Sequence, residues 1–372
     1  MKLNKGEWGE PYVALRLLGD GRLSLADGNG DKRPNEWMNV VEVIRHETAD
    51  RIVRYNRDVE TSMVSVSVNG EECVRLPASD FISSANALKD DIVTGRGRSF
   101  SVSEDVASFL QIAEVLHLKA KSIDKSDIFL TTLDPRTSIE RSDIGFSVKC
   151  KFGQSPTLFN TAVASGVRYK VDGMTKGLMD EINGLVDDKG HAAVSARCQR
   201  LISSGCSLGY VGYAFAKKAG CEAFKENLDL IDPRLPLVIE RILWNHFFMN
   251  QDGNDVTDVV DRIIEQNPCG ITRPEIKYPY MIKSFLYAAY CGMTASTLWS
   301  GKSDVNGGFI MVGDDGEVLA HYALESEDFK AYLYNNCYLE FPATSKKHGD
   351  YAYVYEEDGR YFFKLNFQIR YR

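Results

Sequence analysis

The hydrophobic and polar positions of this chain predict a mixture of strands and helices with no internal repeat. Residues 8–18 are mostly apolar, with Pro11 near their start and Gly19 and Gly21 at their end, which predicts a helix beginning near Trp8. Short strands are predicted at 40–45, 52–55 and 62–68. The third should end at the Asn69-Gly70 turn.

The next predicted elements are an amphipathic helix and a pair of strands. Ser103 is a suitable N-cap for a helix that runs to about Leu118. Two apolar segments, 127–130 and 144–152, flank a polar turn around 134–136 and predict neighbouring strands.

The remaining pattern is helical from 174 to 300 and strand-like afterwards. The segment 237–248 is apolar on one side and predicts a core helix. Strands are predicted at 309–312, 318–322, 351–355 and 361–370. The sequence therefore predicts an α/β (α+β) fold, a mixed β-sheet flanked by helices. We expect an N-terminal core (1–173), a helical region or insertion (174–300) and a C-terminal β-rich segment (301–372) that completes a ligand surface.

Composition limits the class of protein. The 372 residues are 44% hydrophobic and 26% charged, as in ordinary globular proteins. We see no signal peptide and no apolar run of about 20 residues, so we expect a cytoplasmic protein without a membrane span. The eight cysteines form no C-x-x-C pair, which disfavours structural zinc.

The net charge of −8 argues mildly against a nucleic-acid partner, because phosphate contacts usually leave a basic footprint. Local basic clusters nevertheless occur at Arg96 with Arg98, at Lys149 with Lys151, and at 346–348. An acidic exterior can coexist with such clusters.

The candidate chemistry lies on the predicted strand pair. If Asp127 lies beside the Ser147-Val148-Lys149 segment, a carboxylate and an ammonium group meet at the ends of neighbouring strands. The carboxylate could hold Mg²⁺ while the lysine orients water and offsets charge on a phosphorane, as metal-assisted phosphodiester hydrolysis requires. The alternative is a surface lysine on an edge strand and a turn aspartate.

A second carboxylate is expected, because Mg²⁺ is usually held by one or two carboxylates with water and phosphate. Glu7 and Glu10 lie in the first predicted helix and could reach the metal held by Asp127. Either carboxylate could instead serve only to stabilise the helix N-terminus, where negative charge is favourable. The sequence does not show whether Glu7 or Glu10 would reach the metal.

Three segments in the same order as in a known family add to this picture. They are 4–10 (NKGEWGE), 143–149 (DIGFSVK) and 155–161 (SPTLFNT), and the ending at 341–349 and 364–370 agrees. With these segments the chain resembles the HpaII-type restriction endonucleases over nearly its whole length.

The resemblance implies the PD-(D/E)XK nuclease fold and Mg²⁺-dependent cleavage of double-stranded DNA at a short palindrome, with CCGG the family's namesake target. It implies Asp127 as the metal-binding acid, Ser147-Val148-Lys149 as the catalytic strand, Val148 as a further metal ligand, and Glu7 or Glu10 as the helix carboxylate. Ser147 replaces the acid of the general pattern, and Ser126 stands where proline is expected before Asp127.

The resemblance also implies partners. A two-fold symmetric target is compatible with a homodimer, and a companion DNA methyltransferase is expected in the host. Guanine and cytosine edges call for donors and acceptors in the major groove. Together with the basic clusters, the candidate DNA-binding residues are Arg96, Arg98, Lys151, Thr157, Asn160, Lys346, Lys347, His348, Gln368 and Arg370.

Three other interpretations remain open: a nuclease that reads DNA structure, a DNA-binding relative without catalysis, and a protein-interaction scaffold.

Overall fold

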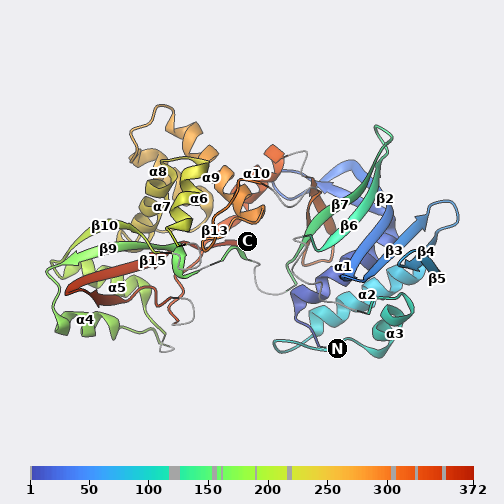
Figure 1. The fold of residues 1–372 in the computed structure, drawn as a ribbon, viewed down its shortest axis with the longest axis horizontal. Helices are drawn as coiled ribbons and strands as arrows, with labels where there is room; N and C mark the ends of the chain where they lie inside the picture. The colour runs from blue at the N-terminus through green and yellow to red at the C-terminus, as the bar shows by residue number, and fades with distance from the viewer. Residues whose placement is uncertain are drawn as a thin grey trace. The chain divides into compact units, whose positions relative to one another are not determined.

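The chain forms two compact units. The computed structural model describes residues 2–116, 126–152, 157–160, 162–188, 191–215, 220–302, 307–322, 326–345 and 349–372. Unit 1 comprises Met1–Pro156 and Asp304–Tyr332, and unit 2 comprises Thr157–Ser303 and Leu333–Arg372 (Figure 1).

Unit 1 is built on a nine-stranded mixed sheet in the order β1-β12-β11-β7-β6-β2-β3-β4-β5. Its strands are β1 (Arg22–Ala26), β2 (Lys32–Thr48), β3 (Arg51–Asp58), β4 (Met63–Val68), β5 (Glu71–Pro77), β6 (Ile128–Asp134), β7 (Ile139–Cys150), β11 (Gly308–Val312) and β12 (Val318–Tyr322). β11 runs parallel to β7 and β12 runs parallel to β1, while the other pairs are antiparallel. β1 also pairs with β2, so six of the strands form a closed ring of pairings.

Three helices lie wholly within the described residues of unit 1: α1 (Lys5–Asp20), α2 (Ala78–Thr94) and α3 (Glu104–Ile112). α1 and α2 lie together in this unit (Figure 1). Trp8, Tyr12, Phe81, Leu88 and Phe146 are among the buried side chains of one continuous core. Burying a large apolar side chain contributes roughly 1.5–3 kcal/mol, so this core fixes α1 on the sheet.

Unit 2 contains two smaller sheets. The four-stranded sheet has the order β10-β9-β15-β14 and the three-stranded sheet the order β13-β16-β8. Their strands are β8 (Thr157–Phe159), β9 (Gly166–Asp172), β10 (Ser207–Tyr213), β13 (Cys337–Leu339), β14 (Val354–Glu357), β15 (Arg360–Asn366) and β16 (Ile369–Tyr371).

The helices of unit 2 supply much of its aromatic core. They are α4 (Lys176–Asn183), α5 (Val194–Ser203), α6 (Ala223–Ile231), α7 (Leu235–Leu243), α8 (Val256–Gln266) and α9 (Pro274–Tyr290), and α10 (Ser326–Asn335) crosses the boundary between the units. The core helix predicted at 237–248 exists, but it is α7 followed by a π-helical turn at Trp244–Phe248. Phe248 from this turn packs edge-on against Tyr169 and Phe363.

The expected α+β class with a mixed sheet and flanking helices is confirmed, and several boundaries are corrected. α1 begins at Lys5 rather than near Trp8 because Asn4 caps it. α3 ends at Ile112 rather than near Leu118, and Glu114 has a positive φ of 59°. The strand predicted from Tyr351 begins only at Val354, after Asp350 and Ala352 adopt positive φ angles of 51° and 61°.

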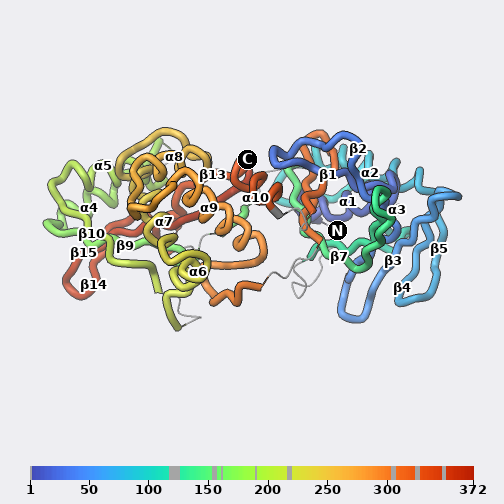
Figure 2. Tube along the Cα trace, turned by 90° about the horizontal axis from the view of Figure 1, so that it is seen from above, coloured from blue at the N-terminus to red at the C-terminus, as the bar shows by residue number. Residues whose placement is uncertain are grey.

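The two units divide the chain differently from the three segments expected from sequence. β11 and β12, expected in the C-terminal segment, complete the sheet of unit 1 beside β7, as the orange trace in Figure 2 shows. β8 and β9, expected in the N-terminal core, belong to unit 2. The region 174–300 also supplies a strand, β10.

Two further findings bear on the class of protein. No described helix is long and apolar enough to cross a membrane. All eight cysteines are free thiols.

Candidate active site

A cavity of about 830 Å³ in unit 1 brings together the side chains that the sequence singled out. It is lined by Asn4, Lys5, Gly6, Glu7, Glu10, Gly97, Arg98, Asp127, Val148, Lys149 and Cys150. These residues come from the start of α1, the connection between α2 and α3, the residue before β6 and the end of β7.

The pairing of β6 with β7 places Asp127 against the catalytic candidate strand. Ile128 pairs with Phe146, so Asp127 stands opposite Ser147. The Ser147 hydroxyl donates a hydrogen bond to Asp127 Oδ2 at 3.0 Å, and the Val148 N–H donates to the same oxygen at 2.7 Å. Lys149 lies two residues after Ser147 and therefore projects from the same face of β7. The sequence predicted that Asp127 and Lys149 would lie close together, and both line this cavity.

Glu10 is the acid of the cavity whose pKa is raised most clearly. Burial raises the pKa of its carboxyl to about 7, and the negative charges of Asp127 and Glu7 add to the rise, while Arg45 and Lys149 oppose it. Any positive charge that enters the cavity therefore stabilises the ionised form of this carboxyl.

Glu7 has a different role in the fold. Its Oε2 accepts a hydrogen bond from the Asn4 backbone N–H at 2.9 Å, and its own N–H donates to Asn4 Oδ1 at 2.9 Å. This reciprocal pair is a capping box, which satisfies two of the unpaired N–H groups at the start of α1. Glu7 therefore holds the helix end, whereas Glu10 lies one turn further on, beside the charge of Asp127.

A close approach of α1 to β7 positions Glu10. A Cβ added to Gly9 would lie 2.0 Å from the Cys150 Sγ, so only glycine fits there. Burial, followed by the charge of Glu10, raises the pKa of the Cys150 thiol to about 12. The thiol therefore stays protonated at neutral pH and serves as packing rather than as a nucleophile.

The donor set fits a hard divalent cation. Within the described residues no group of three or more His, Cys, Asp or Glu side chains lies close enough to hold a metal. Mg²⁺ does not require one, since one or two carboxylates with water and substrate phosphate are its usual ligands. Asp127 and Glu10 supply two oxygen donors whose negative charges interact unfavourably without a cation.

The candidate DNA-binding residues are spread over the molecule. Arg98 lines the cavity, whereas Arg96 on the same connection does not. Lys151 follows β7, and its N–H donates to the Val312 carbonyl. Lys346, Lys347 and His348 lie outside the described residues.

The candidates of unit 2 differ in accessibility. Thr157 on β8 pairs with Arg370 on β16, so these two lie side by side, and Arg370 forms an ion pair with Glu340 at 2.7 Å. Asn160 is exposed, but Gln368 is only 6% exposed.

The sequence interpretation did not single out five residues of the cavity: Asn4, Lys5, Gly6, Gly97 and Cys150. Asn4 and Glu7 have the three-residue spacing of a capping box, a signal present in the sequence. Nothing local marks Lys5, whose Nζ donates to the Val93 carbonyl at 3.3 Å.

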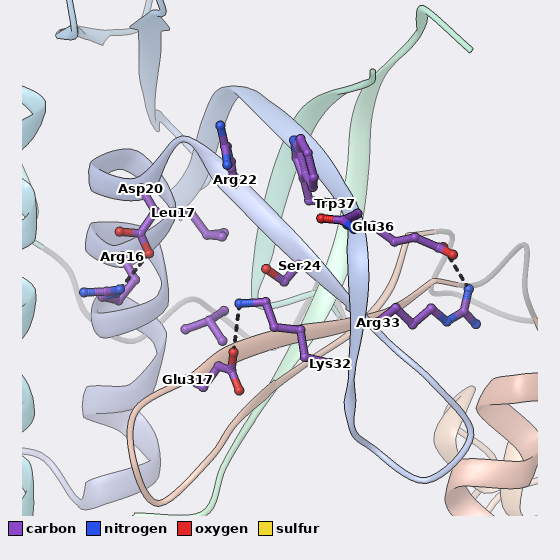
Figure 3. A pocket seen from close by; sticks show the side chains of 12 residues that line it. Arg16, Leu17, Asp20, Arg22, Ser24, Lys32, Arg33, Glu36, Trp37 and Glu317 are labelled. Atoms are coloured by element: carbon purple, nitrogen blue, oxygen red, sulfur yellow. Dashed lines mark hydrogen bonds and ion pairs between the residues drawn. The ribbon is translucent and has the colours of Figure 1, made fainter. Parts of the chain in front are cut away.

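A second cavity in unit 1, of about 380 Å³, has a different chemistry (Figure 3). Its acids are paired: Asp20 with Arg16 at 2.7 Å, and Glu317 with Lys32 at 3.0 Å. Arg22 lies over the Trp37 ring, 4.7 Å from its centre. Because its carboxylates are already neutralised, this cavity is a poorer metal site than the one around Asp127.

Comparisons with known proteins agree over nearly the whole chain. The family model described as HpaII restriction endonuclease matches residues 4–371. The chain is also similar to the type II restriction enzyme HpaII of Haemophilus parainfluenzae, with 30% identity over 379 residues that cover 99% of this chain and 98% of that protein. No solved structure matches the chain significantly.

Proposed function

This chain belongs to the HpaII restriction endonuclease family, and on that premise we propose that it cuts double-stranded DNA at a short palindrome with a metal ion held by Asp127 and Glu10. Family membership makes the chain a type II restriction enzyme, a hydrolase that cleaves DNA at specific sites. The observation that carries the proposal is the convergence of Asp127, Glu10 and Lys149 on one cavity.

The proposed metal ligands are Asp127 and Glu10, with the backbone of Val148 beside them. Mg²⁺ held by these residues would supply Lewis-acid chemistry, polarising the phosphate and making water more acidic. The hydrogen bonds from Ser147 and Val148 hold Asp127 Oδ2 in place, so the carboxylate is oriented before substrate enters. Ser147 takes the place of a second strand acid, and Glu10 from α1 supplies that missing carboxylate.

Lys149 is the proposed cation of the reaction. Its ammonium group can donate to the attacking water and to a non-bridging phosphate oxygen, where negative charge grows in the transition state. The water oxygen binds phosphorus as the water gives up one proton, one P–O bond of the backbone breaks, and the departing oxygen takes up one proton, so that a phosphate monoester and a free hydroxyl result. Asp127 would thus act by holding the metal ion, while Lys149 acts directly on the water and the phosphate.

The finer features rest on the family resemblance. We assign the unit 1 sheet with α1 to the PD-(D/E)XK nuclease fold and propose CCGG, the family's namesake target, as the recognition sequence. Thr157 and Arg370, which lie side by side, are the candidates for contacts with base edges or phosphates in unit 2. We further propose a cytoplasmic homodimer and a companion methyltransferase in the host.

The proposal is tested by digesting supercoiled plasmid with the purified protein. With Mg²⁺ we expect a discrete set of linear fragments whose sequenced ends share one palindrome, and with EDTA we expect intact plasmid. Cleavage of branched DNA without a shared end sequence would instead indicate a structure-reading nuclease. Failure to nick DNA with either Mg²⁺ or Mn²⁺ would indicate a DNA-binding relative without catalysis.

A further inference from the structure

The active-site cavity holds more positive charge than the cleavage step uses. Lys5 and Arg98 line it together with Lys149, although they lie far apart in the sequence. The metal-binding acids make the cavity unfavourable for a DNA phosphate until positive charge compensates. Cations without an acidic partner are therefore the groups to examine.

Arg98 is such a group. Its side chain is exposed, and it forms no ion pair or hydrogen bond with any residue in the described part of the chain. Arg16, Arg33, Arg51 and Arg54 of the same unit are all engaged by carboxylates. Arg98 thus offers the cavity a charge that none of the described residues neutralises.

The loop that carries Arg98 is fixed at both ends. At one end the Gly95 N–H donates to the Asp91 carbonyl at 2.8 Å, which closes α2. At the other end Phe100 exchanges two backbone hydrogen bonds with Leu3, at 3.1 and 3.0 Å. The Phe100 carbonyl also accepts a hydrogen bond from the Trp8 indole at 3.2 Å.

A second set of hydrogen bonds joins the two ends of the loop. The N–H and hydroxyl of Ser103 both donate to Asp91 Oδ2 at 2.8 Å. Phe100 is therefore held against the start of α1, the helix that carries Glu10, and Arg98 lies two residues from this anchor. A fixed base reduces the conformational entropy lost when Arg98 binds a ligand.

We propose that Arg98 contacts a non-bridging oxygen of a phosphate that flanks the scissile one, with Lys5 adding a second positive charge at the same cavity. This inference rests on the proposed function, in which Asp127, Glu10 and Lys149 engage the scissile phosphate. A cavity of about 830 Å³ has room for a neighbouring phosphate as well. Arginine suits the role because its planar guanidinium donates two parallel hydrogen bonds to phosphate oxygens.

The contact is tested with short duplexes that carry the cut site mapped by plasmid digestion. Each phosphate near the cut is replaced in turn by a neutral methylphosphonate, and affinity is measured with Ca²⁺ in place of Mg²⁺. We expect wild-type protein to lose affinity at the flanking position. Arg98→Ala should bind the unmodified duplex about tenfold more weakly, as expected for the loss of a charge-assisted phosphate contact, and should be indifferent to methylphosphonate at that position.

The salt dependence gives a second measure. Loss of one phosphate contact should reduce the slope of log affinity against log salt by about 0.9, and Arg98→Lys should restore that slope. Arg96→Ala is the matched comparison, because Arg96 lies on the same loop but not in the cavity. It should keep the wild-type response to methylphosphonate at the flanking position.

Two results would overturn the inference: Arg98→Ala retaining both the wild-type salt slope and every methylphosphonate penalty, or Arg96→Ala losing the same penalty. Either result can arise while the wild-type protein still cuts DNA in Mg²⁺, so it would leave the proposed function standing. Absence of cleavage by the wild-type protein would count against the proposed function itself.

Discussion

Glu7 and Glu10 lie three residues apart on α1, yet they face different partners. Glu7 is engaged by the backbone of Asn4, and Glu10 is half-buried near the charge of Asp127. The sequence predicted that Asp127 and Lys149 would lie close together, because a turn joins the two apolar segments that carry them. It did not show which of the two glutamates would lie at the metal site. The environment of Glu10 arises from packing against a strand more than 100 residues away, which no local pattern reveals.

Because Glu10 is the proposed metal ligand and Glu7 caps the helix, substitutions at the two positions should have different effects. Glu10→Ala should raise the Mg²⁺ concentration for half-maximal cleavage at least tenfold, because a metal ligand is lost. Glu7→Ala should leave that concentration nearly unchanged but lower the free energy of unfolding by about 1 kcal/mol, because one hydrogen bond of the capping box is lost. Metal titrations of cleavage and denaturant unfolding of both variants check this, and a larger metal effect from Glu7→Ala would reverse the assignment.

His321 predicts how stability depends on pH. Burial among Phe309, Phe329 and Tyr332 lowers the pKa of its imidazole from 6.5 to about 4. The unfolded chain therefore takes up a proton near pH 6.5, while the folded protein does so only near pH 4. Stability from the neutral ring is complete above pH 6.5 and falls as the pH drops towards 4, by about 3 kcal/mol in total.

Unfolding free energies of wild type and His321→Gln, measured between pH 7 and 4, test this expectation. Other groups titrate in both proteins, so the difference between the two curves isolates His321. The wild type should lose more stability on acidification than the variant. Parallel curves would show that His321 does not contribute.

At the scale of elements, the register between α1 and β7 determines the site. The strands around the candidate residues could be predicted from alternation and turn residues. α2 was missed although Phe81, Ala85, Leu88 and Ile92 have helical spacing, because its Ser, Asp and Asn residues weaken helix propensity. β5 was missed because it is an exposed strand with few apolar residues.

The close approach of α1 to β7 can be tested by adding one methyl group. Gly9→Ala places a Cβ against the Cys150 Sγ, so α1 must move away from β7 and carry Glu10 with it. We expect a loss of about 1–3 kcal/mol of stability and slower cleavage. In the double variant with Cys150→Ala, much of both losses should be recovered, because the clashing sulfur is gone. Strictly additive effects in unfolding and cleavage assays would contradict this account.

At the scale of the whole molecule, charge is distributed unevenly between the units. Unit 1 contains 22 Lys and Arg against 31 Asp and Glu, whereas unit 2 contains 22 against 21. The acidic excess that argued against a DNA partner therefore lies in the unit with the proposed metal ligands. Unit 2 has no such excess to oppose phosphate contacts.

Long-range organisation was the part of the fold least accessible from sequence. β11 joins β7 from more than 150 residues away, and the chain passes through most of unit 2 between them. Parallel pairing of this kind leaves no local turn signal, unlike the β6–β7 hairpin. The sequence pattern predicted the positions of the strands but not which strands pair with one another.

The most direct test of the account is to compare cutting with binding in Lys149→Ala. Cleavage of a duplex carrying the mapped site is followed at saturating enzyme with Mg²⁺, and binding of the same duplex is followed by gel shift. Lys176→Ala, an exposed lysine of α4 in unit 2, is the control and should behave as wild type. We predict that Lys149→Ala binds the site but does not cut it. Cleavage by Lys149→Ala at the wild-type rate would contradict the assignment of this cavity as the catalytic centre.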